Sequence, residues 1–295
     1  AGTDSGDLIQ LTLNSSDEYK EVKIANFLSI SQSVISSIHV AEDTGRVGIR
    51  VLVVSEGNVY VIDLRSGCSV KRMSQFKGGV AVANRVCSSG RMGLSFVFDE
   101  VESENWSSSV GGKLMKRLGG GIQANARIKG SSNFSSYDNS NGGSVFVLAM
   151  ARQLVFVDLC NSDDEKMSPC VVLKEMPCIE GVKMIAWLDD SLILGTSNGY
   201  YLMSCVSEHI SLIFSLRDMV DHPRLKVFSK EEKALLVADN AGIFVDIHGQ
   251  PVGGSLVFRN SPDSIADLSA YVVVSKDGKM ELYHKRSGSC VQAFS

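Results

Sequence analysis

The stretch Leu192–Ser204 reads LILGTSNGYYLMS and contains the G-x-S-x-G pattern of a hydrolase nucleophile elbow at Gly195, Ser197 and Gly199. Such an elbow places its serine on a strained turn between a strand and a helix. A short apolar strand precedes the pattern, but an aromatic and apolar run without helical periodicity follows it. Asn198-Gly199 between two apolar runs instead predicts a β-hairpin, because both turn positions favour positive φ. We therefore interpret Ser197 as a turn residue, with a serine hydrolase as the remote alternative.

The same sequence pattern, an apolar strand followed by a tight polar turn and a second apolar strand, recurs along the chain. The opening AGTDSGDLIQLTL is a second version of the phrase, with Asp4 aligned to Ser197. The other hairpins are centred on Gly57, Arg152, Gly199, Gly242 and Gly278. Their turns lie about 36 to 51 residues apart, apart from one doubled gap, as expected for the four-stranded blades of a β-propeller. The predicted fold is all-β, a β-propeller; a two-sheet sandwich is the alternative.

Composition restricts the classes of function. The chain has 295 residues, 44% of them hydrophobic, and a formal net charge of −4, which gives no reason to expect a nucleic-acid partner. No apolar run approaches the roughly 20 residues of a membrane span, and no secretory signal is recognisable. The seven cysteines include no C-x-x-C pair, which favours reduced thiols and a cytoplasmic location. The chain begins within a hairpin phrase, and we expect it to be part of a longer protein.

A Ser-, Gly- and Asn-rich region, residues 87–143, explains the doubled gap. We predict that it is a flexible insertion within one blade and that GLSFVFDE adds a strand inside it. Five of its basic residues cluster between Glu104 and Asp138, where no acidic residue occurs. These five are candidates for contact with an anionic membrane or an acidic partner, the alternative being a linker kept soluble by its charges. They are Lys113, Lys116, Arg117, Arg127 and Lys129.

No residue pattern indicates a catalytic, metal or cofactor site. Gly119, Gly121 and Ala124 formally match a dinucleotide-binding pattern, but no strand precedes them and no clear helix follows. The histidines are scattered, and the acidic run Asp163–Glu165 lacks the order of a calcium loop. We expect a protein that is not an enzyme, without cofactor or metal.

Three phrases in order resemble the C-terminal half of a citron homology (CNH) domain. They are MIAWLDDSLILGTSNGYYLMS, ALLVADNAGIFVDIHGQPVGG and YVVVSKDGKMELYHKRSG, and earlier segments are similar to its preceding blades. The clearest marks are W-L-x-x-S-L-x-x-G-T-x-x-G-Y-Y at Trp187–Tyr201 and G-I-F-V-D-x-x-G-x-P at Gly242–Pro251. The second phrase is most similar to the endosomal and vacuolar tethering branch, and within it to the CORVET-type subunit, with the HOPS-type subunit as the alternative.

The resemblance implies a single seven-bladed propeller over residues 1–295 that precedes an α-solenoid. It implies a non-enzymatic domain that recognises a small GTPase of the Rab class, binds other tethering-complex subunits, and acts peripherally on endosomes or the vacuole. A module that only joins subunits is the structural alternative. The family offers no catalytic motif, so no active-site residue is nominated.

Overall fold

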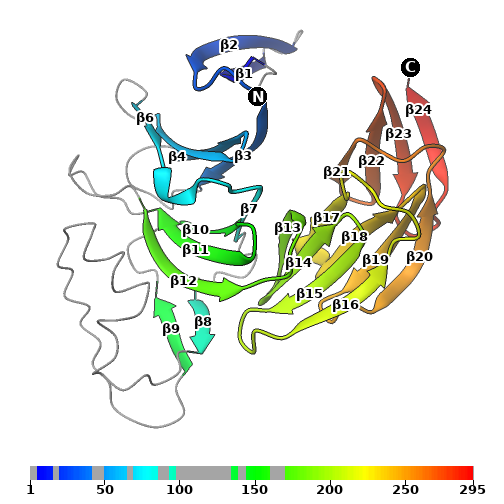
Figure 1. The fold of residues 1–295 in the computed structure, drawn as a ribbon. Helices are drawn as coiled ribbons and strands as arrows, with labels where there is room; N and C mark the ends of the chain where they lie inside the picture. The colour runs from blue at the N-terminus through cyan, green and yellow to red at the C-terminus, as the bar shows by residue number, and fades with distance from the viewer. Residues whose placement is uncertain are drawn as a thin grey trace.

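The structure is a computed structural model, and it describes residues 5–15, 20–41, 50–64, 69–85, 93–97, 134–138, 144–159 and 170–294. Nearly all of the regular structure in these ranges is antiparallel β-sheet (Figure 1). Two short 3₁₀ turns, η1 (Ser74–Phe76) and η3 (Ser229–Glu231), lie among the strands. No helix in the described ranges is long and apolar enough to cross a membrane.

Five four-stranded sheets, which we call blades 1 to 5 in chain order, make up most of the described chain. Blade 1 contains β3 (Ile35–Ala41), β4 (Arg50–Ser55), β5 (Asn58–Asp63) and β6 (Ser69–Arg72). Blade 2 contains β7 (Ala81–Asn84), β10 (Ser144–Ala149), β11 (Gln153–Leu159) and β12 (Val171–Pro177). Blade 3 contains β13 (Val182–Leu188), β14 (Ser191–Thr196), β15 (Gly199–Ser204) and β16 (Ile210–Ser215). Blade 4 contains β17 (Leu225–Phe228), β18 (Lys233–Ala238), β19 (Ala241–Asp246) and β20 (Pro251–Val257). Blade 5 contains β21 (Ser264–Leu268), β22 (Tyr271–Lys276), β23 (Lys279–His284) and β24 (Cys290–Phe294).

The blades are arranged around a common axis, as in a β-propeller. Within each blade the strands follow one another in sequence order, and the first strands of successive blades contact each other: β3 with β7, β7 with β13, β13 with β17, and β17 with β21. The first strands are therefore the innermost. In Figure 1 the described sheets form an open arc that runs from β1–β2 at one end to blade 5 at the other.

A separate apolar core fills each junction between neighbouring blades, which explains the consecutive apolar residues of the strands. On β14, Leu192 and Leu194 pack toward blade 2, whereas Ile193 between them packs toward blade 4. All three side chains have no exposed surface. A strand covered on both faces needs apolar residues at every position, because successive side chains point to opposite sides.

The prediction of a β-propeller is confirmed, but the expected seven blades are corrected to five in the described residues. The first hairpin phrase is not a blade centre: β1 (Asp7–Ser15) pairs forward with β2 (Lys20–Ser29), which gives a sheet of two strands. Leu8 of β1 packs against blade 1. In its described residues the long insertion contributes β8 (Gly93–Val97) paired with β9 (Phe134–Asp138), which confirms the strand predicted in GLSFVFDE. The number of hairpin turns in the sequence does not give the number of blades, because a hairpin can belong to a sheet with fewer than four strands.

The turn of the opening phrase needs two corrections. Thr196 pairs with Gly199, so the turn residues are Ser197 and Asn198, and neither they nor Gly199 has positive φ. Gly199 is required for another reason: a Cβ there would lie 2.9 Å from the carbonyl oxygen of Phe214. The carbonyl of Asn198 accepts a hydrogen bond from the residue that follows β16, and the carbonyl of Gly6 accepts one from the residue that follows β2. Ser5, not Asp4, is therefore the counterpart of Ser197.

Candidate interaction surface

The G-x-S-x-G pattern does not form a nucleophile elbow. Strands β14 and β15 are antiparallel neighbours on either side of Ser197, and no helix follows the serine. The carbonyl of Ser197 accepts a hydrogen bond from the backbone N–H of Val220 at 2.8 Å, so the turn supports the next loop. The geometry that a hydrolase would need at this pattern is missing.

Tyr200, within the Y-Y mark of the first family phrase, joins blade 3 to blade 4. Its side chain is fully buried, and its hydroxyl accepts a hydrogen bond from the N–H of Arg224 at 3.0 Å. The same hydroxyl lies 2.8 Å from the carbonyl oxygens of Arg224 and Val237, to one of which it donates. Burial raises the pKa of Tyr200 to about 12, so the hydroxyl keeps its proton at neutral pH.

The glycines of the second family phrase have similar structural roles. Gly242 is buried, and a Cβ there would lie 2.9 Å from both Leu235 Cδ1 and Phe258 Cζ. Gly249 has φ +74°, and its place against Ile213 brings the β19–β20 turn onto blade 3. Tyr200 and Gly249 of the family phrases therefore hold blades 3 and 4 together, and Gly242 leaves room for the packing of Leu235 and Phe258 within blade 4.

The five predicted basic residues lie outside the described residues. The connection that contains them leaves β7 near Arg85 and rejoins the sheet at Ser144 of β10, between the first and second strands of blade 2. Arg85 is tied to blade 3: its guanidinium lies 2.7 Å from Asp190 Oδ1 and 5.7 Å from the ring centroid of Trp187. Arg85, just before the insertion, is thus held beside the β13–β14 turn. The role of the five residues stays a prediction.

The opposite side of the propeller forms a surface that we call the loop face. It consists of the segments that leave each fourth strand and the turns between the second and third strands, which hydrogen bonds join within blades 1 to 4. Examples are Leu216 N–H to the Asn198 carbonyl at 2.9 Å and Phe258 N–H to the Asn240 carbonyl at 2.7 Å. The side chain of Met219 on the β16–β17 loop is 82% exposed. Binding residues are often found on loops that a rigid scaffold holds in place.

Two further exposed apolar residues lie on the loop face. Val80 precedes β7 and is 51% exposed, and Val34 precedes β3 and is 50% exposed. Sequence analysis did not single out these residues. Met219 lies in the connection between β16 and β17, and its residue type alone predicts burial.

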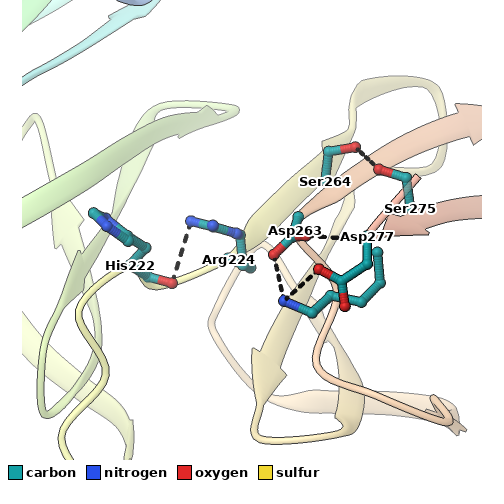
Figure 2. Close-up of polar contacts among 7 residues, drawn as sticks. His222, Arg224, Asp263, Ser264, Ser275 and Asp277 are labelled. Atoms are coloured by element: carbon teal, nitrogen blue, oxygen red, sulfur yellow. Dashed lines mark hydrogen bonds and ion pairs between the residues drawn. The ribbon is translucent and has the colours of Figure 1, made fainter. Parts of the chain in front are cut away.

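Figure 2 shows polar contacts of the loop face on the connections that enter blades 4 and 5. Lys276 Nζ donates to Asp263 Oδ1 at 2.9 Å and lies 3.9 Å from Asp277. The hydrogen bond from Lys276 lowers the pKa of the exposed Asp263 carboxyl. Arg224 donates to the carbonyl of His222 at 3.3 Å. Because two carboxylates surround the one lysine ammonium group, the cluster offers no net positive site for an anion.

Potential metal ligands and buried thiols are the other side chains to consider in the described ranges. No group of three or more His, Cys, Asp or Glu residues there could hold a metal ion. Burial raises the pKa of Cys178 to about 11 and that of Cys205 to about 12, so neither thiol is a nucleophile at neutral pH.

Family comparison agrees with the phrases that the sequence displays. The CNH domain family matches residues 1–295, and the chain therefore belongs to that family. Among curated proteins, the chain is 38% identical over 298 residues to Vacuolar sorting protein 3 of Arabidopsis thaliana. The match covers all of this chain and 29% of that protein, so the chain spans less than a third of its relative's length.

Solved structures support the fold alone. A nidogen/laminin complex structure aligns with 99% of this chain and 91% of its own chain at a TM-score of 0.52 and 9% identity. Apo AztD from Citrobacter koseri aligns with 99% of this chain and 81% of its own at a TM-score of 0.51 and 11% identity. At such low identity the likeness says nothing about function.

Proposed function

We propose that this chain is a non-enzymatic protein-interaction domain of a vacuolar-sorting tethering subunit associated with endosomes or the vacuole. The observation that carries the proposal is the 38% identity to Vacuolar sorting protein 3 along the whole of this chain. The structural roles of Tyr200 and Gly242 support it, because the residues that mark the family stabilise a rigid platform.

The finer proposal is recognition of a Rab-class GTPase in its GTP form, in a CORVET-type complex, with a HOPS-type complex as the alternative. The γ-phosphate of GTP orders the switch loops of a GTPase, and a surface that contacts these loops would distinguish the GTP form from the GDP form. We place the contact on the loop face because its exposed apolar residues, led by Met219, lie on loops fixed by backbone hydrogen bonds. The other tethering-complex subunits would bind elsewhere on the same protein.

A pull-down tests this proposal. The protein is immobilised and offered early- and late-endosomal Rab proteins, each loaded with a non-hydrolysable GTP analogue or with GDP. Capture of an early-endosomal Rab only in the GTP form supports the CORVET assignment, and late-endosomal selectivity supports the HOPS assignment. Met219→Asp should abolish capture, whereas His248→Asp, in the exposed β19–β20 turn on the other side of the blades, should not. Capture of neither Rab would refute GTPase recognition by this domain.

Blade 5 favours a second candidate, a module that joins parts of a larger assembly. Leu282 and Val273 are only partly buried, although their counterparts in blade 4, Phe244 and Leu235, are 3% and 0% exposed. Met280 beside them is 48% exposed. Blade 5 thus presents a face of the kind that the other blades bury against a neighbour. Binding that does not depend on the nucleotide would support this role instead.

The basic insertion carries a separate part of the proposal, contact with anionic membrane. Neutralising all five basic residues should weaken binding to liposomes that contain phosphatidylserine, by about 1 kcal/mol for each residue near the membrane surface. Unchanged binding would leave the region as a solvated linker.

A further inference from the structure

Strands β1 and β2 take the position of a blade beside blade 1, at one end of the arc in Figure 1. Leu8 of β1 and Leu28 of β2 pack in the apolar cluster of blade 1 that contains Val53, as one blade packs against the next. Their sheet has two strands in the described residues, whereas each of the five blades has four. Half of a blade is therefore in place next to blade 1.

A backbone hydrogen bond identifies which half it is. In blade 3 the residue directly after the fourth strand, Leu216, donates its N–H to Asn198, the second residue of the turn between the second and third strands, at 2.9 Å. Blade 4 has the equivalent bond at 2.7 Å. Ile30, directly after β2, donates in the same way to Gly6, directly before β1, at 3.0 Å. Strand β1 therefore corresponds to a third strand and β2 to a fourth strand, and the described residues lack the two inner strands.

The inner strand of blade 1 is uncovered at the place where those two strands would lie. Ile38 and Val40 of β3 are directly opposite Val53 and Val51 of β4, so all four side chains lie on the face that β1 and β2 cover. Val51 and Val53 are 4% and 0% exposed, whereas Val40 is 48% exposed and Ile38 is only partly buried. The cover that β1 and β2 provide thus ends at β4.

The first strands of other blades bury the side that faces the preceding blade. On β13, Val182, Ile185 and Trp187 are 4%, 5% and 7% exposed and pack in the cluster shared with blade 2. On β7, Val82 is 5% exposed and packs in the cluster shared with blade 1. The exposure of Val40 therefore marks a position that an inner strand of the preceding blade covers elsewhere in the fold.

We propose that the chain segment immediately N-terminal to Ser5 forms an antiparallel hairpin that completes the β1–β2 sheet as a four-stranded blade. The strands of each blade follow one another in sequence order, which places both inner strands before β1 in the chain. The second strand of this hairpin leads through Ser5 and Gly6 into β1, and its first strand lies against β3 and covers Ile38 and Val40.

The expected hairpin resembles β13 and β14, which have seven and six residues. Its first strand should place apolar side chains toward β3. The match to Vacuolar sorting protein 3 covers 29% of that protein, so the relative has chain outside this region. The inference concerns assembly of the domain and does not depend on GTPase recognition.

Cysteine labelling of the full-length protein tests whether β3 is covered. Val40→Cys should react with a maleimide at least about tenfold more slowly than Val257→Cys, because a covered thiol reacts only when the structure opens locally. Peptide mass spectrometry measures each site separately. Val257 on β20 is the matched control, since its side chain is 65% exposed and lies far along the chain from β3. Equal rates at the two positions would overturn the proposal.

Removal of the chain before Ser5 tests which segment provides the cover. Labelling of Val40→Cys should then rise to the rate of Val257→Cys, while the native Cys205, 1% exposed, should stay unlabelled if the domain remains folded. If Cys205 becomes reactive, a photoactivatable residue in place of Val40 in the intact protein decides instead, and its cross-links should map to the segment before Ser5.

Two results of these experiments would refute the identity of the segment. One is slow labelling of Val40→Cys that persists in the folded deletion variant. The other is a photoactivated residue at position 40 that cross-links to another part of the chain, to a second copy, to another protein, or to nothing.

Discussion

Replacement of Tyr200 by Phe removes a single hydroxyl from the junction of blades 3 and 4. That hydroxyl accepts the N–H of Arg224 at 3.0 Å and donates at 2.8 Å to the carbonyl of Arg224 or Val237. The carbonyl of Arg224 also accepts the N–H of Val237, so it keeps one partner in the variant. The N–H of Arg224 loses its acceptor, and the carbonyl of Val237 loses the hydroxyl that lies 2.8 Å away.

The expected loss of unfolding free energy is about 2–3 kcal/mol, from two hydrogen bonds worth about 1 kcal/mol each and the cost of leaving buried groups without partners. Urea unfolding followed by circular dichroism measures it as a lower midpoint with an unchanged m-value. Tyr201→Phe is the matched control. Tyr201 is only partly buried, so its change should stay within about 0.5 kcal/mol.

The titration of Tyr200 gives an independent readout. Burial raises its pKa to about 12, above the value of about 10 expected in the unfolded chain. Between these values the unfolded state loses the proton first, so stability should fall as pH rises, and Tyr200→Phe should reduce that slope. If Tyr200→Phe is no more destabilising than Tyr201→Phe and leaves the alkaline slope unchanged, the hydroxyl does not join the blades.

Three other predictions concern the same architecture. Lys285→Met should lower the unfolding free energy by about 1–3 kcal/mol, because the buried ammonium group pairs with Glu231 and Asp267. Urea unfolding measures this change, and an unchanged midpoint would contradict the prediction. Burial raises the pKa of the Glu231 carboxyl, but hydrogen bonds from Lys233 and Lys285 outweigh this effect and leave the pKa lowered. The free energy of unfolding should therefore fall as acid protonates this carboxyl. Glu231→Gln should make the free energy of unfolding depend less on pH in the acidic range. Gly242→Ala should cost about 1–3 kcal/mol, since its Cβ would lie 2.9 Å from two packed side chains; a thermal transition equal to that of the parent would show that the junction can relax.

The repeated local sequence pattern by itself determined the positions of most hairpins and the family of this protein. The hairpins around Gly57, Arg152, Gly242 and Gly278 follow from two apolar runs on either side of a polar turn, and the structure has a hairpin at each. Family phrases predicted the CNH assignment, which the match over residues 1–295 confirms. Such features depend on residues adjacent in sequence, which is why they can be read from it.

Only the tertiary structure decided what those residues do. The tyrosine of GTSNGYY at position 200 gains its role from Arg224 and Val237 of the next blade, which no local pattern identifies. Blade number depends on which strands pair, and the first phrase yields two strands although it resembles a blade centre. Exposure of Met219 and Leu212 is likewise a result of assembly, since the same residue types are buried elsewhere in the fold. Contacts between blades join residues far apart in the chain, and a sequence pattern that repeats within each blade does not specify them.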